Sequence, residues 1–286
     1  MSVRTSSSVS FEIFPPKTGD GLVALRHTLQ QLAVAEPSFV SVTYGAGGSD
    51  RHRSFDAIAA VRDAGLAATA HVTCVGQSIA EIDAVLARYA ALGVGQVVAL
   101  RGDPASGIDG AYVAHPDGYQ RTADLVAAAA AQFDVAVSAY PERHPQSPSD
   151  DHDLDVLAEK VMAGATRAVT QMFFDDDALL RYRDRVAARG VDVTIVAGIF
   201  PIHSFPAVAR FAARCGASIP AAVVAPFAGL DDDPAATHAV AVEVAAGQIA
   251  HLRAHGVDQM HLYTLNRAEL ALAVCERIGL IESARA

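Results

Sequence analysis

Short apolar or β-branched segments alternate with alanine-rich helical segments along the whole chain, and this alternation restricts the possible folds strongly. Eight candidate strands lie near residues 9–14, 38–43, 67–73, 95–101, 134–140, 166–174, 192–199 and 258–264. Helical patterns lie near 20–35, 53–64, 79–91, 118–132, 151–163, 176–189, 203–215, 235–255 and 267–279. Strands that alternate with helices form parallel sheets. Eight such units predict an α/β fold of the closed (β/α)8 or TIM barrel type, with an open doubly wound sheet as the alternative.

The organisation of the chain is uniform. No change in composition and no Pro- or Ser-rich linker interrupts the 286 residues, so we predict a single catalytic barrel domain over 1–286. Residues 1–8 are expected to form a flexible N-terminus, and 217–234 an extra element near the barrel mouth. The aspartate runs at 150–151, 175–177 and 231–233 each precede a helical pattern, which predicts helix N-caps and first-turn residues rather than metal ligands.

Charge and cysteine content exclude several classes of protein. Lys and Arg total 22 against 32 Asp and Glu, a net charge of −10, which does not suit general nucleic-acid binding. The three cysteines are widely spaced and form no CxxC pair, as expected of a reduced protein. The chain has no signal-peptide pattern and no run of 18 apolar residues, so we expect a cytoplasmic protein without a membrane partner.

Polar residues collect where the predicted strands end. The C-terminal ends of all barrel strands meet at one rim, where catalytic groups of such barrels lie. The polar set there comprises Glu12, Thr43, Tyr44, His71, Arg101, Gly102, Asp103, Tyr140, Glu142, His144, Gln171 and residues 263–267. A strand buried on both faces is normally almost all apolar, so each polar residue needs a partner or a function. Taken singly, Glu12 could be held by an internal arginine, His71 could be a hydrogen-bonded core histidine, and Gln171 could bond to neighbouring backbone.

The residue types at this rim exclude several kinds of chemistry. A Schiff-base enzyme needs an interior lysine, but Lys17 follows two prolines and Lys160 lies on a helix. No HxH or HExxH pattern occurs, so no metal site is predicted, and no GxSxG motif indicates a serine nucleophile. What remains is one carboxylate for proton transfer, a second near an arginine, and amide and hydroxyl groups. This set suits an organic redox cofactor, which the residues alone do not name.

Nine stretches in order along the chain resemble the 5,10-methylenetetrahydrofolate reductase family, in its bacterial single-domain form. They are SFEIFPPK (10–17), FVSVTYGAGG (39–48), AHVTC (70–74), VALRGDP (98–104), SAYPERHP (138–145), AVTQMFFD (168–175), AGIFPI (197–202), FAGLDDD (227–233) and HLYTLNRAE (261–269). The resemblance implies a barrel that binds FAD non-covalently and takes hydride from NADH or NADPH. It also implies ping-pong reduction of methylenetetrahydrofolate to 5-methyltetrahydrofolate for methionine synthesis, and a homo-oligomer.

The resemblance also implies the roles of individual residues. Glu12 matches the general acid of the family, and burial among apolar neighbours is expected to raise its pKa. Asp103 matches an aspartate beside the flavin that contacts the pterin and tunes flavin reactivity. Substrate binding is expected from Glu12, Asp103, Gln171, Phe211, Tyr263 and Arg267. FAD binding is expected from Thr43, Tyr44, Ala46, His71, Arg101, Gly102, Asp103, Tyr119, Tyr140, His144, Asp153 and Lys160.

Some positions depart from the family pattern, and two other functions stay open. Val156 and Glu159 stand where relatives have polar or basic residues near FAD, and Ala207 stands where a glutamine contacts substrate. Lys160 would neutralise a phosphate, or it is an ordinary solvated helix lysine. The alternatives are another flavin barrel, such as a proline-dehydrogenase-like oxidase, and a non-catalytic folate- or flavin-binding protein.

Overall fold

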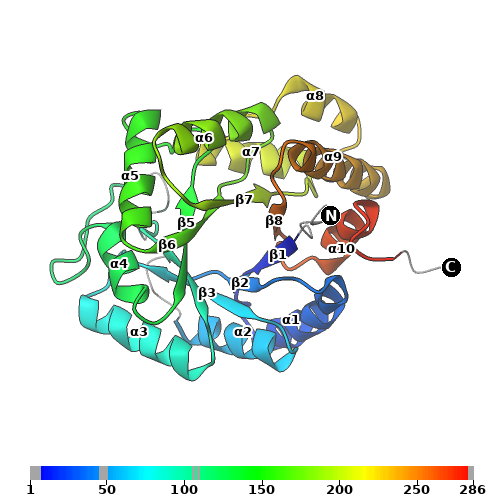
Figure 1. Ribbon diagram of the computed structural model, residues 1–286. Coiled ribbons are helices and arrows are strands. Elements are labelled where there is room, and N and C mark those ends of the chain that lie inside the picture. The colour runs from blue at the N-terminus through cyan, green and yellow to red at the C-terminus, as the bar shows by residue number, and fades with distance from the viewer. Residues whose placement is uncertain (1–7, 45–50, 105–106, 108–109, 283–286) are drawn as a thin grey trace, which may run out of the picture.

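The computed structural model describes residues 8–44, 51–104, 107 and 110–282. Eight parallel strands form a closed barrel in the order β1 to β8, and β8 pairs with β1 (Figure 1). The predicted (β/α)8 barrel is confirmed, and the open sheet is wrong. The strands are β1 (Ser8–Ile13), β2 (Val40–Val42), β3 (Ala68–Thr73), β4 (Gln96–Leu100), β5 (Asp134–Ala139), β6 (Ala165–Thr170), β7 (Thr194–Ile199) and β8 (Gln259–Tyr263).

Helices surround the barrel (Figure 1). They are α1 (Gly19–Leu32), α2 (Arg51–Asp63), α3 (Ile79–Ala91), α4 (Thr122–Ala129), α5 (Asp150–Met162), α6 (Asp176–Ala188), α7 (Phe205–Cys215), α9 (Pro234–Ala254) and α10 (Ala268–Arg277). The short helices are η1 (Ala33–Ala35), α8 (Ala221–Val224) and η3 (Ala225–Phe227), and the last two form the predicted excursion at 217–234. Within the described residues, no helix is long and apolar enough to cross a membrane.

Two predicted boundaries differ from the structure. Residues 1–7 lie outside the described residues, but Ser8, placed in the flexible N-terminus, pairs with Gln259 in the barrel. The predicted sixth strand at 166–174 ends at Thr170, because Met172 and Phe174 leave the ladder and pack in a separate apolar cluster that includes Phe200. This early end places Gln171 at the rim of the barrel.

The apolar core of the described residues forms three clusters, one of which is the cluster of Met172, Phe174 and Phe200 named above. The large cluster packs the outer faces of the strands against the helices. A small cluster of Val98, Ala136, Val169 and Val196, one from each of β4 to β7, lies within the barrel. Val98 and Val169 also line the cavity described below, so this inner layer forms part of its floor.

The aspartate runs cap helices as predicted. Asp175 accepts a hydrogen bond from Asp177 N at 3.1 Å and Asp233 accepts one from Ala236 N at 2.9 Å, at the starts of α6 and α9. Asp150 and Asp151 occupy the first turn of α5, where they face the positive end of the helix dipole.

Gly198 of β7 lies between Thr170 of β6 and Tyr263 of β8, and the contact between these two residues, called the seam here, leaves no room for a side chain at Gly198. A Cβ added there would lie 2.2 Å from Thr170 O and 2.8 Å from the Tyr263 ring. We therefore expect Gly198→Ala to lower the free energy of unfolding by about 3 kcal/mol or more. Gly247→Ala on α9, where a Cβ meets nothing within 4 Å, is the control and should stabilise by about 0.5–1 kcal/mol.

The measurement is urea unfolding followed by far-UV circular dichroism, since the chain has no tryptophan. A Gly198→Ala protein as stable as wild type would show that the seam relaxes freely, contrary to the packing described here.

Candidate active site

A cavity of about 550 Å³ opens among the C-terminal ends of the strands. Most predicted site residues meet there, although their positions in the sequence span 250 residues. Those that line it are Glu12, Thr43, His71, Arg101, Gly102, Asp103, Tyr140, His144, Asp153, Lys160, Gln171, Phe211 and Tyr263. The cavity therefore collects side chains from almost every strand, as expected for a barrel rim.

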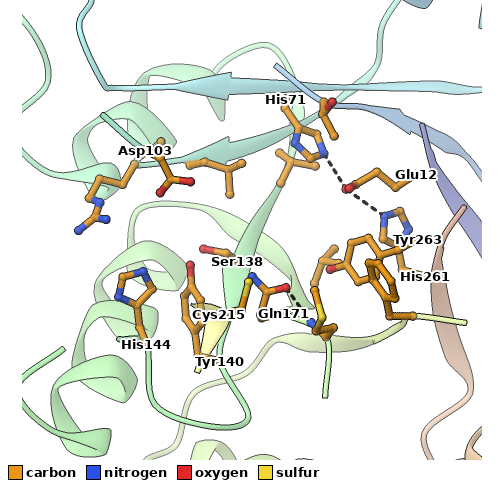
Figure 2. A pocket seen from close by; sticks show the side chains of 18 of the residues that line it. Glu12, His71, Asp103, Ser138, Tyr140, His144, Gln171, Cys215, His261 and Tyr263 are labelled. Atoms are coloured by element: carbon orange, nitrogen blue, oxygen red, sulfur yellow. Dashed lines mark hydrogen bonds and ion pairs between the residues drawn. The ribbon is translucent and has the colours of Figure 1, made fainter. Parts of the chain in front are cut away.

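The carboxyl group of Glu12 lies between two histidines at one side of the cavity (Figure 2). Its Oε2 is 3.5 Å from His71 Nε2 and 3.6 Å from His261 Nε2. These imidazoles occupy the place that an internal arginine would have taken, so the arginine alternative for Glu12 is wrong. His71 is buried, as a core histidine would be, but it faces the carboxyl group and the cavity.

The hydrogen bonds of His261 determine which of its nitrogens faces Glu12. Ser10 Oγ donates to Met260 O at 3.1 Å and is hydrogen-bonded to His261 Nδ1 at 2.7 Å. The Nε2 atom then points to Ser41 Oγ, 3.3 Å away, and to Glu12. Nε2 can accept a proton from either group or carry one itself.

The expectation of a raised pKa for Glu12 is wrong for this structure. Burial does raise the pKa, and it is the largest single influence. The hydrogen bond from His261, the charges of His71 and His261 and a hydrogen bond from Ser41 together outweigh it, so the pKa of Glu12 lies below its usual 4.5. The sequence reasoning counted the apolar neighbours on β1 but not the imidazole contributed by β8.

The other side of the cavity carries positive charge and aromatic rings. Lys160 of α5 is buried, and its Nζ donates to Ser138 O at 3.3 Å. Burial, the largest influence, lowers the pKa of Lys160 to about 8. The guanidinium of Arg101 lies 4.9 Å from the Tyr112 ring centroid, and the His144 ring packs edge-on against Tyr140. A buried ammonium needs an anionic partner, so this end is suited to a phosphate group, and the solvated-lysine alternative for Lys160 is wrong.

Contacts around this charged end fix its loops. Asp153 accepts the backbone N–H of His144 at 3.0 Å, which ties the loop after β5 to the first turn of α5. Val156 lines the cavity, whereas Glu159 is exposed and pairs with Arg121 at 3.7 Å. The departure at Glu159 therefore points away from the cavity.

The substrate-side residues are held by local bonds. Gln171 Oε1 accepts the Met172 N–H at 2.9 Å, which orients the side-chain amide at the rim, as the backbone-bonding alternative proposed. The Tyr263 hydroxyl donates to Thr170 O at 2.6 Å, so that its ring rather than its hydroxyl faces the cavity. Phe211 of α7 is partly exposed at the same cavity.

Four predicted residues are not among those that line the cavity. Tyr44 donates to Gln77 Oε1 at 3.0 Å, and Tyr119 packs against the core. Arg267 is exposed and borders a separate small pocket beside His203. Ala46 lies outside the described residues. The roles of these four residues stay predictions.

Sequence reasoning missed His261, the second partner of Glu12. It also missed Ser10 and Ser41, which bond to His261, and cavity residues such as Ser138, Met172, Phe200 and Cys215. His261 satisfies the criterion that identified Glu12, a titratable residue inside an apolar strand, and could have been found by it. Among the described residues, no group of three or more His, Cys, Asp or Glu could hold a metal ion.

Fold and site together define a (β/α)8-barrel enzyme whose cavity joins a carboxyl–imidazole cluster to a cationic end. The chain matches the family model described as "Methylenetetrahydrofolate reductase" over residues 2–279. The chain therefore belongs to the methylenetetrahydrofolate reductase family. It is an oxidoreductase that reduces methylenetetrahydrofolate to methyltetrahydrofolate.

Similar proteins match nearly the whole chain. The 5,10-methylenetetrahydrofolate reductase of Pectobacterium carotovorum is 40% identical, over 96% of this chain and 90% of its own, and that of Escherichia coli is 39% identical, over 97% and 93%. Arabidopsis thaliana methylenetetrahydrofolate reductase (NADH) 1 is 33% identical over 98% of this chain but only 49% of its own.

A solved structure from Clostridium thermocellum shares the fold. Described as an uncharacterized protein that binds two copies of 5-methyl-5,6,7,8-tetrahydrofolic acid, it has a TM-score of 0.61 and 13% identity, and covers 95% of this chain and 96% of its own. At this identity the likeness supports the barrel fold alone.

The environment of His71 predicts a pH dependence of stability. Burial, the largest influence, lowers the pKa of His71 below 6.5, so on acidification the unfolded chain binds this proton before the folded chain does. The contribution of neutral His71 to stability is therefore complete above pH 6.5 and declines as the pH falls below it. His71→Gln should lose less free energy of unfolding than wild type between pH 7 and 5.

Urea unfolding at a series of pH values between 7 and 5 measures this difference. His27→Gln, at an exposed position on α1, is the control and should keep the wild-type slope. Equal slopes for His71→Gln and wild type would contradict the buried, neutral state of His71.

Proposed function

We propose that the protein is an FAD-dependent reductase that uses a reduced nicotinamide to convert 5,10-methylenetetrahydrofolate into 5-methyltetrahydrofolate. One observation carries the proposal: a single cavity joins the Glu12–His71–His261 cluster to a cationic end built around buried Lys160. When bound, FAD supplies the hydride transfer between the two substrates. The residues of this chain bind and orient the reactants and manage the proton.

The cationic end suits the diphosphate of FAD. Lys160, Arg101 and His144 line one side of the cavity together with Tyr140 and Asp153. A phosphate beside Lys160 would supply the anion that its buried ammonium needs, and the aromatic rings provide flat apolar contacts. Asp103 and Glu12 line the same cavity and would face the flavin that these cationic residues hold.

The proton step belongs to the Glu12 cluster. The Glu12 side chain is still 21% exposed, and a bound pterin would displace that remaining water. Desolvation raises a carboxyl pKa, so substrate binding itself would favour proton uptake by Glu12. His261 and His71 lie close enough to deliver that proton. Glu12 then donates it to N10 of the substrate, which opens the five-membered ring and leaves an iminium group at N5 to accept hydride.

The shared cavity supports alternating use by the two substrates. One acid cluster and one cationic end serve the same space of about 550 Å³, so nicotinamide and folate would enter in turn, giving ping-pong kinetics. We favour NADH, because the Arabidopsis relative carries that donor in its name. We further propose a cytoplasmic homo-oligomer that supplies methyl groups for methionine synthesis.

Glu12→Gln tests the proposed proton step. The amide cannot act as an acid but has nearly the same shape, so FAD should stay bound and NADH should still bleach the flavin spectrum without oxygen. The rate of methylenetetrahydrofolate reduction should fall by about 10²-fold or more. Stopped-flow absorbance separates the two half-reactions.

Glu142→Gln is the matched control, because this rim glutamate bonds to Ser218 N and does not line the cavity. It should retain both half-reactions. Unchanged folate reduction in Glu12→Gln would exclude Glu12 as the acid, and a flavin that NADH never bleaches would support the non-catalytic alternative instead.

Lys160→Met tests the cationic end. Loss of a charge-assisted bond to phosphate should weaken FAD binding by about 10- to 100-fold, measured by flavin fluorescence on titration. Because the pKa of Lys160 is about 8, wild-type affinity should also fall between pH 7 and 9, and this fall should be absent in the variant. Lys17→Met is the control, because Lys17 is the other lysine of the chain and is exposed. Wild-type FAD affinity in Lys160→Met would disprove the phosphate role.

A further inference from the structure

Two consecutive residues after β8 adopt the left-handed backbone conformation, although neither is glycine. The angle φ is +50° at Leu265 and +57° at Asn266. Asparagine tolerates this region better than most residues, whereas leucine does so at an energetic cost. Such strain persists where surrounding contacts enforce it, and it collects at sites that bind ligands. The contacts of the turn that contains Leu265 and Asn266 therefore show which part of the site this strained conformation holds in place.

The turn holds the end of β1. Asn266 Oδ1 accepts the Phe14 N–H at 3.0 Å, and Asn266 Nδ2 donates to Phe14 O at 2.9 Å. Pro15 and Pro16 follow, and they have no N–H to continue a strand. The side-chain amide of Asn266 thus replaces the pair of bonds that a neighbouring strand would make. It holds both the N–H and the C=O of Phe14 and so fixes the backbone there.

The same turn fixes Glu12. Thr264 Oγ1 donates to Glu12 O at 2.7 Å and accepts the Asn266 N–H at 3.1 Å. Glu12 lies near the end of β1 and Phe14 is the first residue after it, and both side chains line the cavity. Ile13 and Phe14 follow Glu12 along the cavity lining, and Phe14, which lies past the C-terminal end of β1 toward the mouth, is 43% exposed whereas Ile13 is buried.

The chemistry of the substrate determines what meets Phe14. In methylenetetrahydrofolate, N10 is bonded directly to the aminobenzoyl ring. If Glu12 protonates N10, as in the function proposed above on which this argument rests, that ring must leave Glu12 toward the mouth, where Phe14 stands. We propose that Phe14 packs against the aminobenzoyl ring and determines affinity for this part of the substrate. Asn266 is a positioning residue that acts through the backbone of Phe14.

Steady-state kinetics of Phe14→Leu test the proposal, with Phe14→Tyr as the variant that keeps a ring. Phe14→Leu should raise the KM for methylenetetrahydrofolate by about 3- to 10-fold, the value of an aromatic contact, and should change the KM for NADH by less. Phe14→Tyr should stay near wild type. Asn266→Gly, which allows the left-handed conformation but removes the two side-chain hydrogen bonds to Phe14, should raise the same KM.

Two competing inhibitors separate ring contact from general distortion. 5-Methyltetrahydrofolate carries the aminobenzoyl ring, and 6-methyltetrahydropterin lacks it. Phe14→Leu should weaken inhibition by the first compound and leave inhibition by the second unchanged. Equal weakening of both, or an unchanged KM in Phe14→Leu, would overturn the assignment. A wild-type enzyme that does not reduce methylenetetrahydrofolate at all would instead refute the proposed function, and this proposal with it.

Discussion

The pairing of the first strand with the last is the interaction on which the rest of the site depends. Ser10 of β1 lies opposite His261 of β8, and Glu12 lies opposite Tyr263, about 250 positions further along the chain. Only this closure brings a carboxyl group and the imidazole that controls its charge into one cluster. The same pair of strands carries the Ser10 hydroxyl that orients His261 and the turn at 264–267 that holds the backbone of Glu12. Local sequence therefore places Glu12 and His261 in their strands, but only barrel closure brings the two side chains into contact.

The rim divides into two electrostatic halves because of strand order. Strands β8, β1 and β3 contribute the carboxyl–imidazole cluster (Figure 2). The segments that follow β4 and β5, together with α5, contribute Arg101, Tyr140 and Lys160. Burial acts in opposite directions on the two halves: it raises the pKa of Glu12 and lowers the pKa of Lys160. At Glu12 the neighbouring histidines reverse the effect. At Lys160 no comparable compensation occurs, which leaves an ammonium whose charge an anionic ligand would stabilise.

Much of the fold was readable from sequence because its signals are local. The alternation of strands and helices, the helix-capping aspartates and the polar residues at strand ends each depend on neighbours a few positions away, and the structure confirms them. The sign of the Glu12 pKa shift was not readable, because it depends on His261, which only the closed barrel brings beside Glu12, and on His71 and Ser41 from other strands. The Tyr263 hydroxyl is likewise committed to Thr170 by a contact between β6 and β8 across Gly198.

The lowered pKa of Glu12 is compatible with the acid role proposed for it, and the two together would have a consequence for the use of the two substrates. An ionised carboxylate between two imidazoles is stable while water reaches it, but it cannot protonate N10 in that state. On the proposed function, a pterin that fills the cavity would remove the water and favour the neutral acid, so the acid would form only when its target is present. A nicotinamide bound in the same cavity would offer no atom that needs this proton. In the mechanism proposed here, one set of residues would therefore serve two substrates in turn, with the proton moved to Glu12 only for the folate.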